Sequence, residues 1–187
     1  MTIRFFRLLA CQLLLLFACS QALAADTVDI MHAHIEASDE GYKLQSSYSF
    51  ELSHDLEDAL QAGIKLSFTT EVELTRPRWY WTDDKAISER RTVNIWYNPL
   101  MRKYNVQVAG SIYQSYATLD EALLTIRRPG RWVIGPRSAL KTGETYNVSL
   151  RMFMDRQALL KPLQVNAINN AGWQLSSGKK TFLYRAE

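Results

Sequence analysis

Cysteine is nearly missing from this sequence, and both copies, Cys11 and Cys19, lie close to the N-terminus. The rest of the chain therefore has no thiol for a disulfide, a redox reaction or metal ligation. Long apolar runs are also missing after residue 24, so we expect no membrane-spanning segment beyond that point. No stretch rich in proline or glycine divides the chain, which favours a single domain.

The common catalytic fingerprints are absent as well. The sequence contains no nucleophile elbow, phosphate-binding loop, dinucleotide fingerprint or zinc-protease motif. Its formal net charge is only +3, and Arg4 and Arg7 of the N-terminal segment contribute to that value. A nucleic-acid partner is therefore not expected. These absences favour a protein that is not an enzyme and that needs no cofactor.

The N-terminal segment, residues 1–24, has the three parts of a secretory signal peptide. Arg4 and Arg7 provide the positive start, an apolar run follows, and Ala22 and Ala24 are the small residues before a cleavage site. We expect cleavage after Ala24 and export to the periplasm.

Cleavage would leave residues 25–187 as one β-rich periplasmic domain. The alternative is a lipoprotein anchored through Cys19, although Phe17 is larger than the residue usual in that motif.

Most of residues 25–187 alternate between apolar and polar side chains, the pattern of half-buried strands. Turn residues separate the alternating stretches, which favours antiparallel sheets. The apolar positions of these stretches are Tyr42, Leu44, Tyr48, Phe50 and Leu52; Ile64, Leu66, Phe68, Val72 and Leu74; Val93, Ile95 and Tyr97; Tyr104, Val106 and Val108; and Tyr146, Val148, Leu150, Met152 and Met154.

Two of these stretches can be set in register as a hairpin. Asn98 opposite Lys103 brings Ile95 against Val106, so that apolar residues meet on one face. The same register places Trp96 on the opposite, polar face.

Two short segments have helical spacing instead. Residues 118–124 begin with a capping box, Thr118 at the N-cap and Glu121 three residues later. Residues 53–62 are followed by Gly63, a common residue just past a helix end. We therefore predict a mainly β, antiparallel sandwich-like domain with two short α-helices that cover an edge or an open end of the sheets.

The run RPRWYWTDD, residues 76–84, concentrates aromatic rings beside carboxylates. Pro77 should end the preceding strand, so residues 78–82 are predicted to form a separate or bulged strand. On such a strand Trp79 and Trp81 share one face and Tyr80 takes the other.

With Trp96, these rings are candidates to bind a glycan, a peptide or a partner protein. The alternative is that the five tryptophans of the chain fill an aromatic core.

Asp83 and Asp84 are the candidates for general acid and base chemistry, as in a cell-wall hydrolase. Adjacent strand residues point to opposite faces, which argues against a catalytic pair. We therefore predict that the two aspartates end a strand and bond nearby backbone amides. The candidate ligand- or partner-binding residues are Trp79, Tyr80, Trp81, Asp83, Asp84 and Trp96.

His32 and His34 share one face of a predicted N-terminal strand, a spacing that suits zinc or copper. A third ligand would have to come from His54, Glu36 or Asp39. The alternative is a solvated strand, and we predict no metal site.

The sequence resembles a proteobacterial family known as domain of unknown function 4390. The resemblance covers residues 48–177 and rests on ordered runs that include LEDALQAGIKLSFTTEVELTRPRWYW, RRTVNIWYNPLMRKYNV, YATLDEAL and YNVSLRMFMD. The family is exported and has no assigned catalytic residues, so the resemblance implies none here. Its genes tend to lie beside a membrane sensor kinase of the nitrogen-regulation type.

The resemblance therefore implies a regulatory role in the cell envelope. The resulting expectation is a non-catalytic periplasmic binding or accessory module whose partner is an inner-membrane sensor kinase or another envelope protein. A glycan-binding module that uses surface tryptophans is the alternative, and a hydrolase that uses Asp83 and Asp84 is a third.

Overall fold

Strands dominate the chain, as the alternation of apolar residues predicts. The structure is a computed structural model that describes residues 28–77 and 84–187. The strands of these residues are β1 (Asp29–Ser38), β2 (Gly41–Ser49), β3 (Leu66–Arg76), β4 (Asp84–Asn98), β5 (Lys103–Val108), β6 (Gln114–Tyr116), β7 (Trp132–Gly135), β8 (Thr145–Met154) and β9 (Lys180–Arg185). The α-helices are α2 (His54–Gln61), α3 (Leu119–Arg127) and α4 (Lys161–Asn169), and the short 3-10 helices are η1 (Arg137–Ala139), η2 (Arg156–Ala158) and η3 (Ala171–Trp173).

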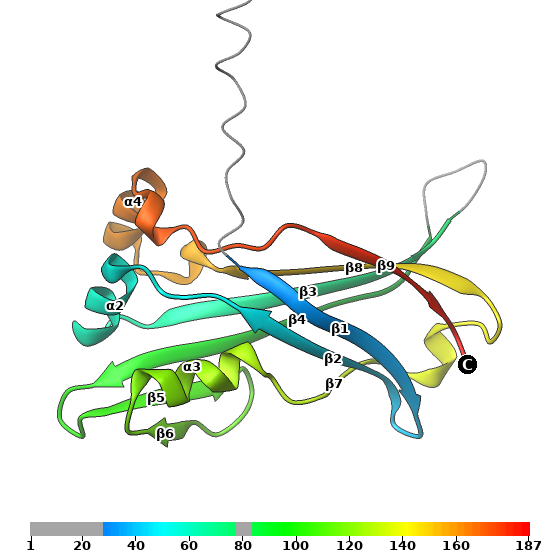
Figure 1. Cartoon of the computed structure of the whole chain (residues 1–187), viewed down its shortest axis with the longest axis horizontal. Helices are drawn as coiled ribbons and strands as arrows, with labels where there is room; N and C mark the ends of the chain where they lie inside the picture. The colour runs from blue at the N-terminus through cyan, green and yellow to red at the C-terminus, as the bar shows by residue number, and fades with distance from the viewer. Residues whose placement is uncertain (1–27, 78–83) are drawn as a thin grey trace, which may run out of the picture.

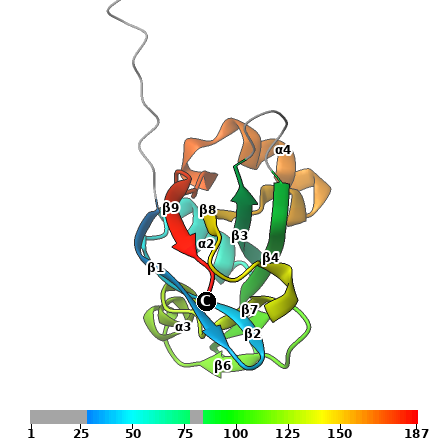
Figure 2. The same ribbon diagram turned by 90° about the vertical axis from the view of Figure 1, so that its right-hand side faces the viewer.

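Two antiparallel sheets face each other in two layers (Figure 1). The small sheet has the order β1-β2-β7, and the large sheet has the order β6-β5-β4-β3-β8-β9. Seen end-on, β1 lies beside β9, and β7 lies beside β4 (Figure 2). Hydrogen bonds link the sheets on the β1 side, from Lys180 Nζ to Ile30 O at 2.7 Å and from the Val28 amide to Ser176 O at 3.3 Å. The predicted antiparallel, sandwich-like fold is confirmed.

The β4–β5 hairpin has the predicted register. Asn98 pairs with Lys103, and Ile95 pairs with Val106. The next pair, Trp96 with Asn105, lies on the opposite face of the sheet. The apolar pairing that the sequence suggests is therefore the pairing that the fold uses.

The region around Pro77 is partly as predicted. β3 ends at Arg76, directly before the proline. The prediction that the aspartates end a strand is wrong for Asp84, which is the first residue of β4 and pairs with Arg76. The reason is that the β3–β4 ladder extends far beyond the apolar part of β4, into a charged stretch where alternation gives no signal.

The two predicted helices are confirmed together with their caps. In α2, the Leu56 amide donates to Ser53 Oγ at 3.3 Å, and Gly63 beyond the helix end has a φ of +82°. In α3, the Glu121 amide donates to Thr118 Oγ1 at 3.3 Å while the Glu121 carboxylate accepts from the Thr118 amide. This is the complete capping box.

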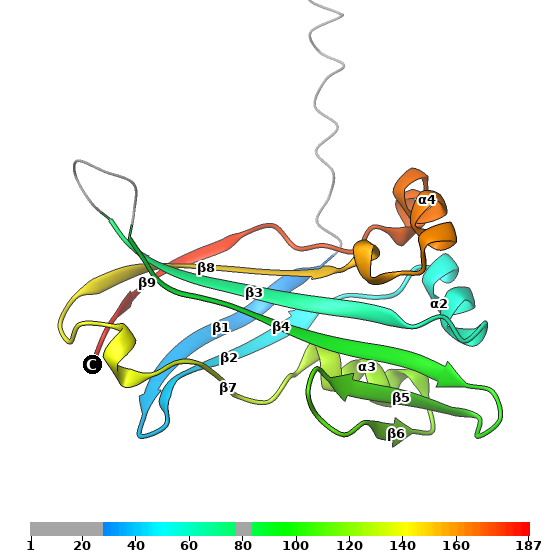
Figure 3. The ribbon, with the colours of Figure 1, turned by 180° about the vertical axis from the view of Figure 1, so that it is seen from behind.

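A third helix, α4, is an addition to the two predicted. Its sequence, KPLQVNAIN, has no continuous apolar stripe, and its stable position comes from contacts with η2 and η3. α4 and α2 lie together at one end of the sandwich (Figure 3), and α3 contacts β5 and β6. No helix in the described ranges is both long enough and apolar enough to cross a membrane.

Apolar side chains between the sheets form two clusters. One lies at the helical end and includes Phe68 and Val93. The other lies toward the opposite end and includes Leu44 and Val72. The residues between these clusters are polar, and they form the candidate site.

Candidate functional site

A layer of polar side chains interrupts the apolar interior. On β3 the inward position between the clusters is Thr70, and on β2 it is Ser46. On β4 it is Arg91, which pairs directly with Thr70. These three residues, called the polar layer below, line one small cavity together with Leu44 and Phe68.

Hydroxyl groups in this region bond to one another. Ser46 Oγ donates to the Tyr48 hydroxyl at 2.9 Å, and Tyr48 lies 3.2 Å from Thr70 Oγ1. Ser46 is 7% exposed and Tyr48 is 4% exposed. Burial raises the pKa of Tyr48, although the hydrogen bonds with Ser46 and Thr70 and the charge of Arg91 act in the opposite direction. Tyr48 therefore stays neutral at physiological pH.

Arg91 adds a positive charge beside these hydroxyl groups. Its Nη1 donates to the Gly130 carbonyl oxygen at 3.0 Å. Burial lowers the pKa of Arg91, but an arginine remains protonated at neutral pH. Within residues 28–77 and 84–187, no carboxylate forms an ion pair with Arg91. A partly buried cation without an anion is unusual, because desolvation is costly unless it is offset.

Arg91 and Trp132 lie between an inner cavity and an outer groove, since they line both. The inner cavity measures about 20 Å³, which is room for one water molecule. The outer groove, called the β4–β7 groove below, measures about 350 Å³. That volume lies within the range of about 300–1,000 Å³ found for ligand pockets.

The walls of the β4–β7 groove combine arginines with apolar side chains. Its lining includes Arg90, Arg91, Val108, Arg131, Trp132 and Val133. Val133 is 40% exposed, so apolar surface is available to a ligand. β7 and β4 also approach each other closely at Gly135, where an added Cβ atom would lie 2.9 Å from the Ile87 side chain.

Free strand edges face each other across this groove. β5 pairs only with residues 93–98 of β4, so among the strands of residues 28–77 and 84–187 none lies on that side of the earlier part of β4. β7 is likewise the last strand of the small sheet. The Thr92 carbonyl accepts from the Ala109 amide on the β5 side. Since backbone groups alternate in direction, Arg90 and Ser88 point their amides and carbonyls to the same open side.

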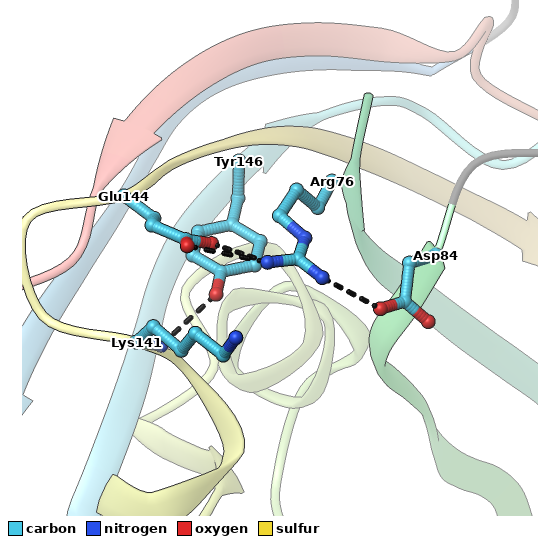
Figure 4. Close-up of polar contacts among 5 residues, drawn as sticks. All are labelled: Arg76, Asp84, Lys141, Glu144 and Tyr146. Carbon is cyan, nitrogen blue, oxygen red and sulfur yellow. Dashed lines mark hydrogen bonds and ion pairs between the residues drawn. The ribbon is translucent and has the colours of Figure 1, made fainter. Parts of the chain in front are cut away.

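Asp84, a predicted site residue, belongs to an ion-pair cluster at the far end of the large sheet (Figure 4). Arg76 Nη2 lies 3.2 Å from Asp84 Oδ2, and Arg76 Nη1 lies 2.8 Å from Glu144 Oε2. The hydrogen bond to Glu144 is the largest of the interactions that raise the pKa of Arg76. Beside it, the Lys141 amide donates to the Tyr146 hydroxyl at 2.9 Å. The cluster joins the end of β3 to the starts of β4 and β8.

The other residues of the aromatic run, Trp79, Tyr80, Trp81 and Asp83, lie outside the described residues. The predicted strand over residues 78–82 lies there too. Their proposed binding role stays a prediction.

Trp96 lies on the polar face of its hairpin, as predicted, but it is only partly exposed. Its ring meets the ring of Tyr113 edge-on, with centroids 5.7 Å apart. Asp84 and Trp96 begin and nearly end the same strand, so at about 3.3 Å per residue they are roughly 40 Å apart. The structure does not bring these two candidates together.

His32 and His34 lie on β1 with ring centroids 6.5 Å apart, and both are exposed. His54 is on α2, where it lies 3.4 Å from Asp58. In the part of the chain that the structure describes, no three His, Cys, Asp or Glu side chains are arranged to hold a metal ion.

Residues 25–183 match the family described as Domain of unknown function (DUF4390). The chain belongs to this family. Comparison with curated proteins and with solved structures gives no significant match. The DUF4390 assignment thus agrees with the resemblance seen in the sequence, and the site is characterised by its own geometry.

The residues that this DUF4390 domain brings together were not among the predicted site residues. The signal was nonetheless present as gaps in the alternation. Position 46 is skipped in the apolar series of β2, position 70 is skipped in that of β3, and the series of β4 starts only after position 91. Polar residues at inward positions of three strands indicate a site between the sheets.

Proposed function

We propose that this protein is an exported, non-catalytic binding module that holds a short extended segment of a partner protein in the β4–β7 groove. The observation that supports this proposal is an edge of β4 that no described strand covers and that faces the similarly uncovered edge of β7 across a groove of about 350 Å³. An extended segment can add to such an edge as a further strand.

Backbone hydrogen bonding supplies the affinity in this mode. Arg90 and Ser88 direct their amides and carbonyls into the open side, where water is the alternative partner. A segment bound there would pair with these groups and place alternate side chains toward Trp132 and Val133. Binding through the main chain is compatible with a modest groove, since few side chains need to enter it.

A second copy of this chain is a poor occupant of the same edge. Edge strands that carry charged residues resist pairing with themselves. Symmetrical pairing of two β4 edges around Arg90 would place arginines of both copies against each other, and like charges directly opposite destabilise a sheet. A segment of a different protein avoids this repulsion.

The side chains of the groove suit binding more than proton transfer. Arginines, hydroxyl groups and apolar residues line it and the adjoining cavity. Arginine stays charged at neutral pH, and Tyr48 stays neutral. The signal peptide that the sequence predicts, with cleavage after Ala24, supports a location in the periplasm. An inner-membrane sensor kinase is then the partner that the family resemblance suggests.

The test uses a blocked heptapeptide of alternating valine and threonine with one central glutamate. Arg90→Pro removes the amide that faces the open edge, and proline is tolerated on edge strands. Arg90→Ala is the matched control, because it removes the same ion pair with Glu71 but keeps the amide. We expect the peptide to bind native protein and Arg90→Ala similarly, and Arg90→Pro at least about tenfold more weakly.

Hydrogen exchange supplies a second readout. The Arg90 amide should exchange more slowly with peptide bound, while the Glu89 amide, which points into the β3 ladder, should not change. Equal affinity of the Arg90→Pro and Arg90→Ala proteins, or an Arg90 amide that exchanges at the same rate with peptide, would overturn the proposal. Circular dichroism of each variant checks that the sheets are intact.

A further inference from the structure

Only one of the three arginines that line the β4–β7 groove lacks a carboxylate partner among the described residues. Arg90 is paired with Glu71, and Arg131 Nη1 lies 3.1 Å from Glu36 Oε1. Arg91 bonds instead to a backbone carbonyl, that of Gly130. Among the described residues, the groove therefore carries one positive charge without a carboxylate partner, that of Arg91.

The guanidinium of Arg91 also has unused donors. A guanidinium carries five N–H groups in a planar fork, and among the described residues only Gly130 accepts a hydrogen bond from it. The hydroxyls of Ser46, Tyr48 and Thr70 satisfy one another and do not engage Arg91. The remaining donors are available to a planar acceptor with two oxygens.

The geometry points to Arg91 as the anchor for a carboxylate of the bound segment, so that the groove selects acidic extended peptides. This inference rests on the proposed function, since it names the ligand class of that same groove. Arg91 lies on β4 next to Arg90, whose backbone would pair with the peptide, so both interactions can be made by consecutive residues of one segment.

The charge balance favours a carboxylate over a phosphate group. A carboxylate carries one negative charge, which matches the one charge, that of Arg91, that lacks a carboxylate partner in the part of the chain that the structure describes. A phosphate monoester carries about 1.5 to 2 negative charges at neutral pH and commonly requires more than one cation. Arg90 and Arg131 already pair with carboxylates of their own, Glu71 and Glu36.

The inner cavity offers a site for a water molecule beside Arg91. It has room for about one water molecule beside Ser46, Thr70 and Arg91. A water there can link the hydroxyls to the guanidinium when a carboxylate arrives from the groove. The hydroxyls would thereby fix the orientation of Arg91 without neutralising its charge.

The experiment compares two peptides on the full chain. One is the heptapeptide with a central glutamate, and the other has glutamine at that position and is otherwise identical. We expect the glutamate peptide to bind native protein at least about tenfold more tightly. Arg91→Gln should abolish the difference, and Arg91→Lys should restore part of it. Arg185→Gln, an equal change of charge on exposed β9, should leave the difference intact.

A second arm tests the anchor without any strand addition. In the nitrogen-15-labelled protein, acetate should shift the NMR signal of the Arg91 Nε–H group, and acetamide should not. Inorganic phosphate is the comparison anion, and a stronger response to phosphate than to acetate would contradict the choice of a carboxylate.

The two proposals can fail separately. Equal binding of both peptides, with loss of both in Arg90→Pro, leaves strand addition in place and overturns the carboxylate anchor. An acetate response without any peptide binding supports the anchor as an anion site and overturns strand addition. If acetate causes no NMR shift and the two peptides bind native protein equally, the proposed carboxylate anchor at Arg91 is overturned.

Discussion

Replacing Arg91 with methionine should stabilise the free protein while it removes the proposed carboxylate anchor. Residues that serve ligand binding often lower the stability of the fold, because they are kept in an environment that does not suit them. Arg91 is such a residue, since it brings a charge into the space between the two sheets and no carboxylate among the described residues balances it. Methionine has a similar length, is flexible and carries no charge.

Three contributions set the size of the effect. Burying an ion fully costs several kcal/mol, so relieving the partial burial of Arg91 contributes about 2 kcal/mol. Apolar contact of the methionine side chain adds about 1 kcal/mol. Loss of the hydrogen bond to Gly130 subtracts about 1 kcal/mol, a small term because Gly130 is exposed and its carbonyl can bond to water. The net expectation is a gain of about 1–2 kcal/mol.

Thermal and urea unfolding measure this gain. For a domain of this size, 1 kcal/mol corresponds to about 2–4 °C in the unfolding temperature, so a rise of about 2–8 °C is expected. Arg185→Met, on the exposed face of β9, is the control for loss of a positive charge and should change stability by less than about 0.5 kcal/mol. A loss of stability in Arg91→Met would refute the reasoning, because it would show that Arg91 supports the fold.

Two further predictions concern the scaffold of the site. Thr118→Ala breaks the capping box with Glu121 and should lower the free energy of unfolding by about 1 kcal/mol in urea titrations, whereas Thr142→Ala, in an exposed loop, should have little effect. The raised pKa of Tyr48 stabilises the folded state below the unfolded pKa of about 10, and this contribution is lost as the pH rises through the higher folded pKa. The free energy of unfolding of Tyr48→Phe should therefore fall less steeply than that of the native protein as the pH rises above about 10. At neutral pH the variant should be about 1 kcal/mol less stable, because the buried Ser46 hydroxyl loses its partner. An unchanged slope of unfolding free energy against alkaline pH would contradict this account.

The strands and their pairing were largely predictable, because alternation reports burial on one face. The register of the β4–β5 hairpin follows from matching Ile95 with Val106. The capping residues Ser53 and Thr118 likewise marked two helices by local chemistry alone. α4 was not predicted, since its position depends on contacts with η2 and η3 rather than on an apolar stripe of its own.

The site was harder to predict, because its members are far apart in the sequence. Ser46, Thr70 and Arg91 each look like an ordinary polar residue of a half-buried strand when taken alone. The predicted site residues lie instead in the aromatic and acidic run that ends at Asp84, where unusual residues are adjacent in sequence, and at Trp96. In the structure Asp84 joins an ion-pair cluster with Arg76, and Trp96 packs on Tyr113.

By itself, the sequence determined the class of the fold, the register of one hairpin and two capped helices, because these depend on periodicity and on neighbours in the chain. Only the tertiary structure decided that the three polar residues that interrupt this periodicity, Ser46, Thr70 and Arg91, line one cavity between the sheets. It also decided that β5 pairs with only part of β4, which leaves an edge of β4 beside β7 that no other described strand covers. Both features depend on how distant strands are placed against each other, and side-chain alternation within a strand carries no information about that placement.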